Sequence, residues 1–150
     1  MTQNQAAART ATLTRTYNAP AQLVFDCCLK PEHLVHWYNA GGGWTTPKAE
    51  TDPRPGGRFN IRFQGPDPKI GFDLTGTYNE IVPPAPGKPG RIKYTLDDGR
   101  PVWMEMLEKD GKTYVTLILT LENTHSEEQQ RHGWGEMLNN LNTYLERKAA

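Results

Sequence analysis

The chain has 150 residues with 17 basic and 17 acidic side chains, so its formal net charge is zero, and 36% of its residues are hydrophobic. This composition is typical of one globular domain. A balanced charge without a basic run argues against a protein that binds nucleic acid or a membrane surface. No apolar stretch is long enough to span a bilayer or resembles a signal peptide, which predicts a cytoplasmic protein.

The two cysteines agree with that compartment. Cys27 and Cys28 are adjacent within a helical pattern, so their side chains point about 100° apart and do not readily form a disulfide. Two buried thiols in a reducing compartment are the expected state, and a redox-active pair is the alternative.

The first part of the chain predicts one strand and two short helices. Residues 1–9 are polar and rich in alanine, and we expect a flexible N-terminus there. Alternation over residues 10–18 indicates a strand. Asn18 is a suitable N-cap for a helix over residues 20–30, which has a proline in its first turn. A second proline begins a short helix over residues 31–37.

The middle of the chain has a period of two, which predicts an antiparallel meander. A short strand is expected over residues 48–51, and about five longer alternating runs begin near Arg58, Phe72, Ile92, Val102 and Val115. Asp-Gly pairs at 98–99 and 110–111 favour tight hairpin turns. The Pro/Gly-rich segment Pro83 to Gly90 predicts a protruding loop.

The end of the chain returns to a helical period. Ser126 and Gln129 form a capping-box pattern, and one apolar stripe follows, comprising Trp134, Leu138, Leu141 and Leu145. An antiparallel sheet with one apolar face must cover that face, and only this last helix is long enough to do so. We therefore predict an α+β fold with a long C-terminal helix packed across a curved sheet, as a single domain over residues 10–150.

Short motifs in a characteristic order occur along nearly the whole chain. They comprise Arg15, Tyr17, Ala19, Pro20, Leu23, Val24, Phe25, Asp26, Pro31, Glu32, His33, Leu34 and Trp37, then Asp52, Arg54, Pro55, Gly56, Gly57 and Phe59, then Gly76, Tyr78, Glu80, Pro83 and Pro84, and finally Gly133, Trp134, Leu138 and Leu141. This order resembles the START-like helix-grip (SRPBCC) superfamily, in the branch named for the C-terminal domain of the activator of the heat-shock chaperone ATPase. The resemblance implies a sheet that grips the last helix, an apolar cavity between them and the two short helices, and a small apolar or lipid ligand.

Large aromatic and methionine side chains converge from several predicted strands and from the last helix. Most are expected to pack in the core, but ring faces and thioethers also suit a hollow interior that holds an apolar ligand. We predict a ligand-binding cavity lined by Trp37, Trp44, Phe59, Phe63, Phe72, Tyr78, Tyr94, Met104, Met106, Trp134 and Leu138. Gly133 and Gly135 flank Trp134, and we expect them to let the helix approach the sheet so that the indole reaches inward.

No residue is predicted to be catalytic, and neither a metal nor a cofactor is expected. The glycines at 41–43 lack the Lys-Ser/Thr continuation of a phosphate loop, and His33 and His36 lack a third ligand at a supporting spacing. Ser126, the only serine, is already assigned to the helix cap.

Two groups of charged residues are interpreted as structural. Asp52 and Arg54 lie in a Pro/Gly turn, where a local charge pair stabilises the reversal. Asp73 and Glu105 are expected to face solvent. If either turned into the cavity beside Arg62, it could instead act as an acid or a base.

These observations favour a module that binds a small hydrophobic molecule without covalent chemistry, and they leave catalysis open. The first alternative is a cyclase- or hydratase-type enzyme that uses the same cavity. The second is a co-chaperone-like domain that binds a chaperone or a second copy of itself through the outer sheet face and loops. Neither nucleic acid nor a membrane is an expected partner.

Overall fold

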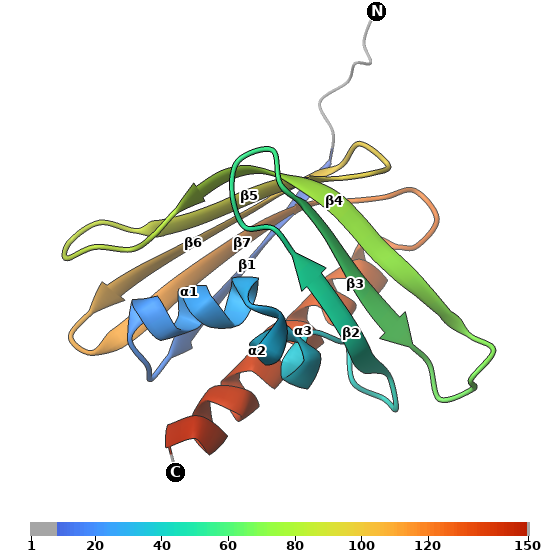
Figure 1. Cartoon of the computed structure of the whole chain (residues 1–150), viewed down its shortest axis with the longest axis horizontal. Coiled ribbons are helices and arrows are strands. Elements are labelled where there is room, and N and C mark those ends of the chain that lie inside the picture. The colour runs from blue at the N-terminus through green and yellow to red at the C-terminus, as the bar shows by residue number, and fades with distance from the viewer. Residues whose placement is uncertain (1–8, 150) are drawn as a thin grey trace, which may run out of the picture.

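Seven antiparallel strands form one curved sheet that wraps around three helices (Figure 1). The computed structural model describes residues 9–149. In chain order the elements are β1 (Thr10–Tyr17), α1 (Ala21–Leu29), α2 (Pro31–Trp37), β2 (Thr45–Thr51), β3 (Arg58–Gln64), β4 (Gly71–Val82), β5 (Gly90–Leu96), β6 (Pro101–Lys109), β7 (Lys112–Thr120) and α3 (Glu127–Ala149). The predicted α+β helix-grip fold is confirmed. The expected flexible segment over residues 1–9 lies outside the described residues, apart from Arg9.

The strand order is β1-β7-β6-β5-β4-β3-β2, with every neighbouring pair antiparallel. The last six strands follow one another as a meander, and β1 joins the sheet beside β7. Asp110 (φ 56°) and Gly111 (φ 77°) both adopt the left-handed conformation that a two-residue type I′ hairpin turn requires. On β3, alternate side chains are buried, as the period of two predicts.

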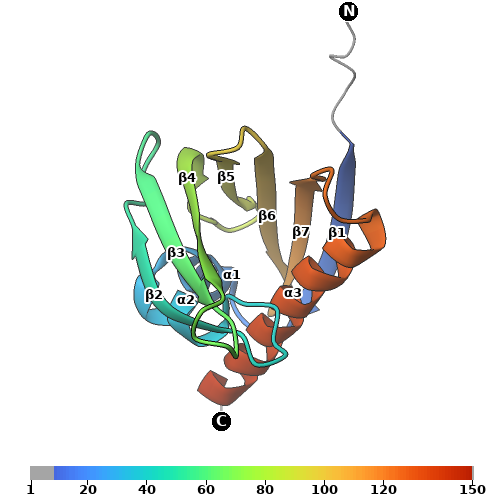
Figure 2. The ribbon, with the colours of Figure 1, turned by 90° about the vertical axis from the view of Figure 1, so that its right-hand side faces the viewer.

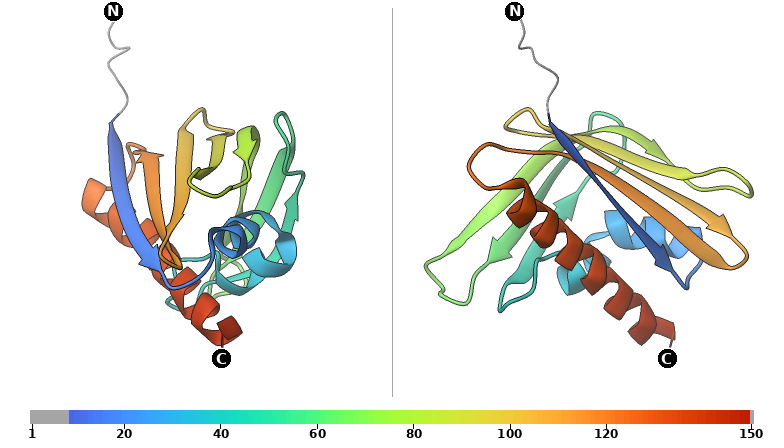
Figure 3. Two further views of the ribbon diagram at one scale, coloured as in Figure 1. Left: turned by 90° about the vertical axis from the view of Figure 1, so that its left-hand side faces the viewer. Right: turned by 180° about the vertical axis from the view of Figure 1, so that it is seen from behind.

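The helices close the concave side of the sheet from two directions (Figures 2 and 3). α3 packs along β1 and contacts α2, whereas α1 contacts β5, β6 and β7, and α2 contacts β2. The expectation that the last helix alone would cover the apolar face is therefore incomplete. Val24, Leu34 and Trp37 of the two short helices are each at most 2% exposed. Part of the sheet is thus covered by α1 and α2.

The N-terminus of α1 is capped differently from the prediction. Pro20, not Asn18, is the N-cap residue, and it has no side-chain cap. Instead, the backbone N–H of Ala21 donates to the carboxylate of Glu108 at the end of β6 (2.8 Å). A carboxylate is favourable at this end of a helix dipole. Because this cap comes from 87 residues further along the chain, no local pattern could indicate it.

Strand β2 begins at Thr45, three residues before the predicted start. Thr45 pairs with Gln64 of β3, and the register shifts before Lys48 pairs with Arg62. Pro47, which cannot donate to a ladder, lies within this irregularity. Because this irregularity interrupts the alternation of side chains, the periodicity of the sequence does not reveal the pair of Thr45 and Gln64.

The capping box of α3 is confirmed. The N–H of Gln129 donates to Ser126 Oγ (3.1 Å), and the N–H of Ser126 donates to Gln129 Oε1 (3.0 Å). Within residues 9–149, no helix is both long and apolar enough to cross a membrane.

The turn between β2 and β3 is held by its backbone more than by its charges. Arg54 Nε donates to Asp52 Oδ2 (2.9 Å), but both side chains are at least half exposed. Gly56 adopts φ 86°, and a Cβ at Gly57 would collide with the carbonyl oxygen of Asp52. The glycines are therefore the residues that the reversal requires.

We predict that Gly57→Ala lowers the free energy of unfolding by at least about 2 kcal/mol, because the backbone of the turn must move. Asp52→Ala is expected to cost less than about 1 kcal/mol, since an exposed ion pair contributes little. Denaturant unfolding of both variants checks this. Equal losses would show that the charge pair, not the backbone, determines the turn.

Candidate functional site

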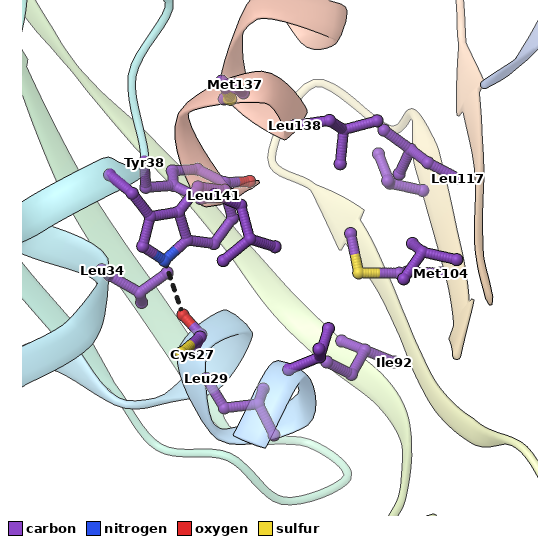
Figure 4. Close-up of a cluster of buried hydrophobic side chains, with 14 of the residues drawn as sticks. Cys27, Leu29, Leu34, Tyr38, Ile92, Met104, Leu117, Met137, Leu138 and Leu141 are labelled. Carbon is purple, nitrogen blue, oxygen red and sulfur yellow. Dashed lines mark hydrogen bonds between the residues drawn. The ribbon is translucent and has the colours of Figure 1, made fainter. Parts of the chain in front are cut away.

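The centre of the molecule is filled by side chains (Figure 4). Leu138 and Leu141 of α3 belong to the same buried cluster as Met104 and Leu117 of the sheet. The indole Nε1 of Trp37 donates to the carbonyl oxygen of Cys27 (2.9 Å), shown as the dashed line. This part of the interior is a packed core.

Seven of the predicted cavity residues belong to that core and do not line the groove described below. They are Trp37, Phe59, Tyr78, Tyr94, Met104, Met106 and Leu138, and none is more than 9% exposed. The expectation that they surround a hollow interior is corrected, because α1 and α2 fill the space and the rings pack on one another. The Phe59 ring lies 5.1 Å from that of Tyr78 and 5.0 Å from that of Tyr94.

A groove opens beside this core, between the sheet and the first half of α3. Its volume is about 390 Å³. Most of its wall is apolar, and one end carries polar side chains. It is lined by Ala40, Trp44, Phe63, Phe72, Leu74, Leu96, Arg100, Glu122, His125, Gln129, Gln130, Gly133, Trp134 and Met137.

Four predicted cavity residues line the groove: Trp44, Phe63, Phe72 and Trp134. Phe72 lies at the end of the β3–β4 hairpin and is 51% exposed. Its ring is 5.0 Å from that of Phe63 and 6.0 Å from that of Trp44. These three rings form a continuous aromatic wall that faces Trp134 and Met137 of α3 across the groove.

Sequence reasoning missed the other lining residues, although some had a signal. Leu74 and Leu96 alternate with buried neighbours on β4 and β5, and Met137 follows Trp134 by three residues on the same helix face. No sequence signal pointed to Arg100, Glu122 and His125, because they come from two connections that meet only in the folded chain.

The polar end of the groove consists of the β5–β6 turn and the segment between β7 and α3. Gln130, which is 8% exposed, holds this segment: its Oε1 accepts from the N–H of Glu122 (2.9 Å), and its Nε2 donates to the carbonyl oxygen of His125 (2.9 Å). The carboxylate of Glu122 accepts from the backbone N–H of His125 (2.6 Å) and contacts its Nδ1 (3.1 Å). These bonds lower the pKa of Glu122.

Gly133 and Gly135 have different surroundings, which corrects the shared role predicted for them. A Cβ at Gly135 would lie 3.1 Å from Nη2 of Arg15, whose guanidinium packs on the helix there. A Cβ at Gly133 would meet no atom within 4 Å. Gly133 lines the groove, so its missing side chain leaves the groove wider and is not needed for helix packing.

The charged residues that the sequence placed outside the cavity are also outside the groove. Asp73 pairs with Arg62 (3.5 Å) and Glu105 with Arg91 (2.9 Å), as expected for side chains on the outer face of the sheet. His33 Nδ1 contacts the hydroxyl of Tyr144 (2.7 Å) in the α2–α3 contact. Within residues 9–149, no group of three or more His, Cys, Asp or Glu side chains is placed to hold a metal ion.

The curved sheet that grips a C-terminal helix defines the class as a helix-grip protein. The profile of the family described as "Activator of Hsp90 ATPase homolog 1-like protein" matches residues 18–146, which is most of the chain. The chain belongs to this family. No curated protein matches it significantly.

Several solved bacterial structures share the fold. The AHSA1-like protein from Aeromonas hydrophila is 28% identical with a TM-score of 0.79, and the match covers 93% of this chain and 94% of that one. A protein from Cytophaga hutchinsonii is also 28% identical, with a TM-score of 0.75 and 92% of each chain covered. A protein from Nitrosomonas europaea is 22% identical, with a TM-score of 0.78 and coverage of 93% and 95%.

The two environments of tryptophan lead to a prediction. Trp37 is 2% exposed, and Trp37→Ala is expected to lower the free energy of unfolding by about 3–5 kcal/mol. Trp134 is only partly buried, so Trp134→Ala is expected to cost about 1–2 kcal/mol, because part of its surface is already in water. Denaturant unfolding measures both. Losses of equal size would contradict the assignment of Trp134 to a groove wall.

The buried tyrosines predict a loss of stability at alkaline pH. Burial raises the pKa of Tyr38 from 10.0 to about 12 and raises those of Tyr17, Tyr78 and Tyr94 further. A phenol whose pKa is raised by folding contributes stability that is complete below the unfolded pKa and is lost as pH rises above it. We expect the free energy of unfolding to fall from about pH 10 upwards, by about 1.4 kcal/mol per pH unit for each such phenol.

Denaturant titrations across this range, with phenolate absorbance of the native protein, measure the effect. Tyr38→Phe should reduce the slope. Phenolate absorbance from all six tyrosines near pH 10 in the folded protein would contradict the prediction.

Proposed function

We propose that the protein binds a small hydrophobic or aromatic molecule in the groove between the sheet and α3, without covalent chemistry of its own. A volume of about 390 Å³ is within the usual range of small-molecule sites. Aromatic and thioether side chains provide most of the contact surface, and a few polar groups at one end can orient a ligand. The free thiols of Cys27 and Cys28 support a reducing compartment, the cytoplasm, as the place of action.

Gly133 is the observation that carries the proposal. A glycine inside a helix costs about 1 kcal/mol relative to alanine. At Gly135 the nearby Arg15 gives a packing reason for this cost, but at Gly133 the space is empty. A residue that weakens the helix and leaves room in the groove is what a binding site requires.

The alternatives have less support. The carboxylates considered for catalysis, Asp73 and Glu105, are paired with arginines on the outer face of the sheet. A protein-interaction domain would use that same face, where Leu107 and Tyr114 are exposed. They lie directly opposite each other on β6 and β7, but the neighbouring pairs on that face, Glu105–Thr116 and Lys109–Lys112, are polar. The groove offers the larger apolar site.

The proposal is tested by filling the groove with Gly133→Leu. We expect its free energy of unfolding to equal or exceed that of the wild type, because leucine has a higher helix propensity. Binding of the neutral fluorescent probe N-phenyl-1-naphthylamine is expected to weaken at least about tenfold, which corresponds to about 1.4 kcal/mol.

The matched control is His132→Leu, which adds the same side chain one residue away at an exposed position outside the groove. This variant should bind the probe as the wild type does. Unchanged probe binding in a folded Gly133→Leu protein, or no binding by the wild type, would show that the proposal is wrong.

A further inference from the structure

The charges at the polar end of the groove are unequally compensated. Among the described residues that line the groove, two are formally charged, Arg100 and Glu122. Arg100 already has a carboxylate partner outside the groove, since its Nε donates to Asp98 Oδ2 (2.8 Å). Its Nη1 donates to the carbonyl oxygen of Thr120 (3.3 Å). The guanidinium is thus neutralised and fixed in place.

Glu122 has no comparable counter-charge of its own. Its carboxylate accepts from the N–H of His125 and contacts Nδ1 of that ring, which is an exposed side chain. Its backbone is fixed by Gln130, so the carboxylate cannot readily turn away. Hydrogen bonds from His125 and the charge of Arg100 lower the pKa of Glu122, so it is ionised near neutral pH.

The charges of Arg100, Asp98 and Glu122 therefore leave this end with one excess negative charge. The side chain of Glu122 is only 25% exposed, so solvent screens it incompletely. An anionic head group placed here would meet this excess negative charge, whereas a neutral head group would not.

A neutral oxygen atom has a suitable partner at this position. Arg100 Nη2 makes no hydrogen bond to any residue in the range 9–149, and a guanidinium can donate from every N–H. A hydroxyl or carbonyl oxygen of a ligand could accept this bond. The aromatic wall of Phe63, Phe72 and Trp44, opposite Trp134, favours flat ligands that present a ring face.

We infer that the groove favours neutral aromatic molecules with a hydroxyl or carbonyl oxygen at one end over anionic amphiphiles such as fatty acids, and that Glu122 is the residue that rejects the anions. This inference rests on the proposed function, because it concerns the ligand of the same groove. It adds the charge class of the ligand and a residue that determines it.

The experiment compares ligands that share one ring system and differ in charge. Isothermal titration calorimetry at about pH 8, above the ordinary pKa of histidine, is performed with 2-naphthol, 2-naphthoate and 2-naphthylmethylammonium. We expect 2-naphthol to bind at least about tenfold more tightly than 2-naphthoate, the difference expected for one uncompensated charge in a partly desolvated site. The ammonium compound is the charge-reversed reference, and the excess negative charge is not expected to weaken its binding.

Glu122→Gln removes the charge and retains the shape of the side chain. It is expected to strengthen 2-naphthoate binding relative to 2-naphthol binding at least about tenfold. Glu105→Gln is the matched control, because it removes a carboxylate from the outer face of the sheet, where Glu105 pairs with Arg91. It should leave all three affinities unchanged.

The outcomes separate this inference from the proposed function. If the three compounds bind the wild type and all lose affinity in Gly133→Leu, but 2-naphthoate binds as tightly as 2-naphthol, the charge selection is wrong and the groove remains the site. If N-phenyl-1-naphthylamine and all three compounds fail to bind, both the charge selection and the proposed function are wrong. Should Glu122→Gln not fold, the wild-type comparison decides the question by itself.

Discussion

The hydrogen bond from the Trp37 indole to the carbonyl oxygen of Cys27 is the interaction on which the rest of the interior depends. A buried indole N–H without a partner would cost roughly 1–3 kcal/mol, so this bond determines how α2 crosses α1. The direction of α2 then positions the next residue, Tyr38, whose hydroxyl lies 3.2 Å from that of Tyr94 on the sheet. It also directs the following loop, which Asn140 of α3 binds through the carbonyl oxygen of Asn39 (2.7 Å). That loop brings Trp44 to the groove.

The order and type of the elements could be predicted because they depend on local patterns. The alternation on β3 and the capping box of α3 are examples in which neighbours in sequence decide the structure. The cap of α1 could not be predicted, because its donor and acceptor, Ala21 and Glu108, are far apart in the chain. The same limit applies to the way the short helices fill the interior.

The kinds of side chains in the candidate site could be predicted from the sequence better than the place of the site in the fold. Large aromatic side chains on an inward face indicate either a core or a cavity, and periodicity does not distinguish between them. Phe59 and Phe63 lie four positions apart, on either side of Ile61, and share one face of β3. Both are buried, yet only Phe63 also lines the groove. What separates them is the rings that fold against each: Tyr78 and Tyr94 pack on Phe59, whereas the half-exposed Phe72 lies beside Phe63, and these contacts are a property of the folded chain.

The core and the groove share part of their residues. Phe63, Leu96 and Met137 belong to the buried cluster and also line the groove, whereas Phe72, Gly133 and the polar side chains at its end line the groove without belonging to that cluster. Sequence change confined to the second set leaves the buried cluster intact, so that binding preference can diverge while the fold is kept. The solved structures that share this fold at 22% to 28% identity show that it tolerates change at most of its positions.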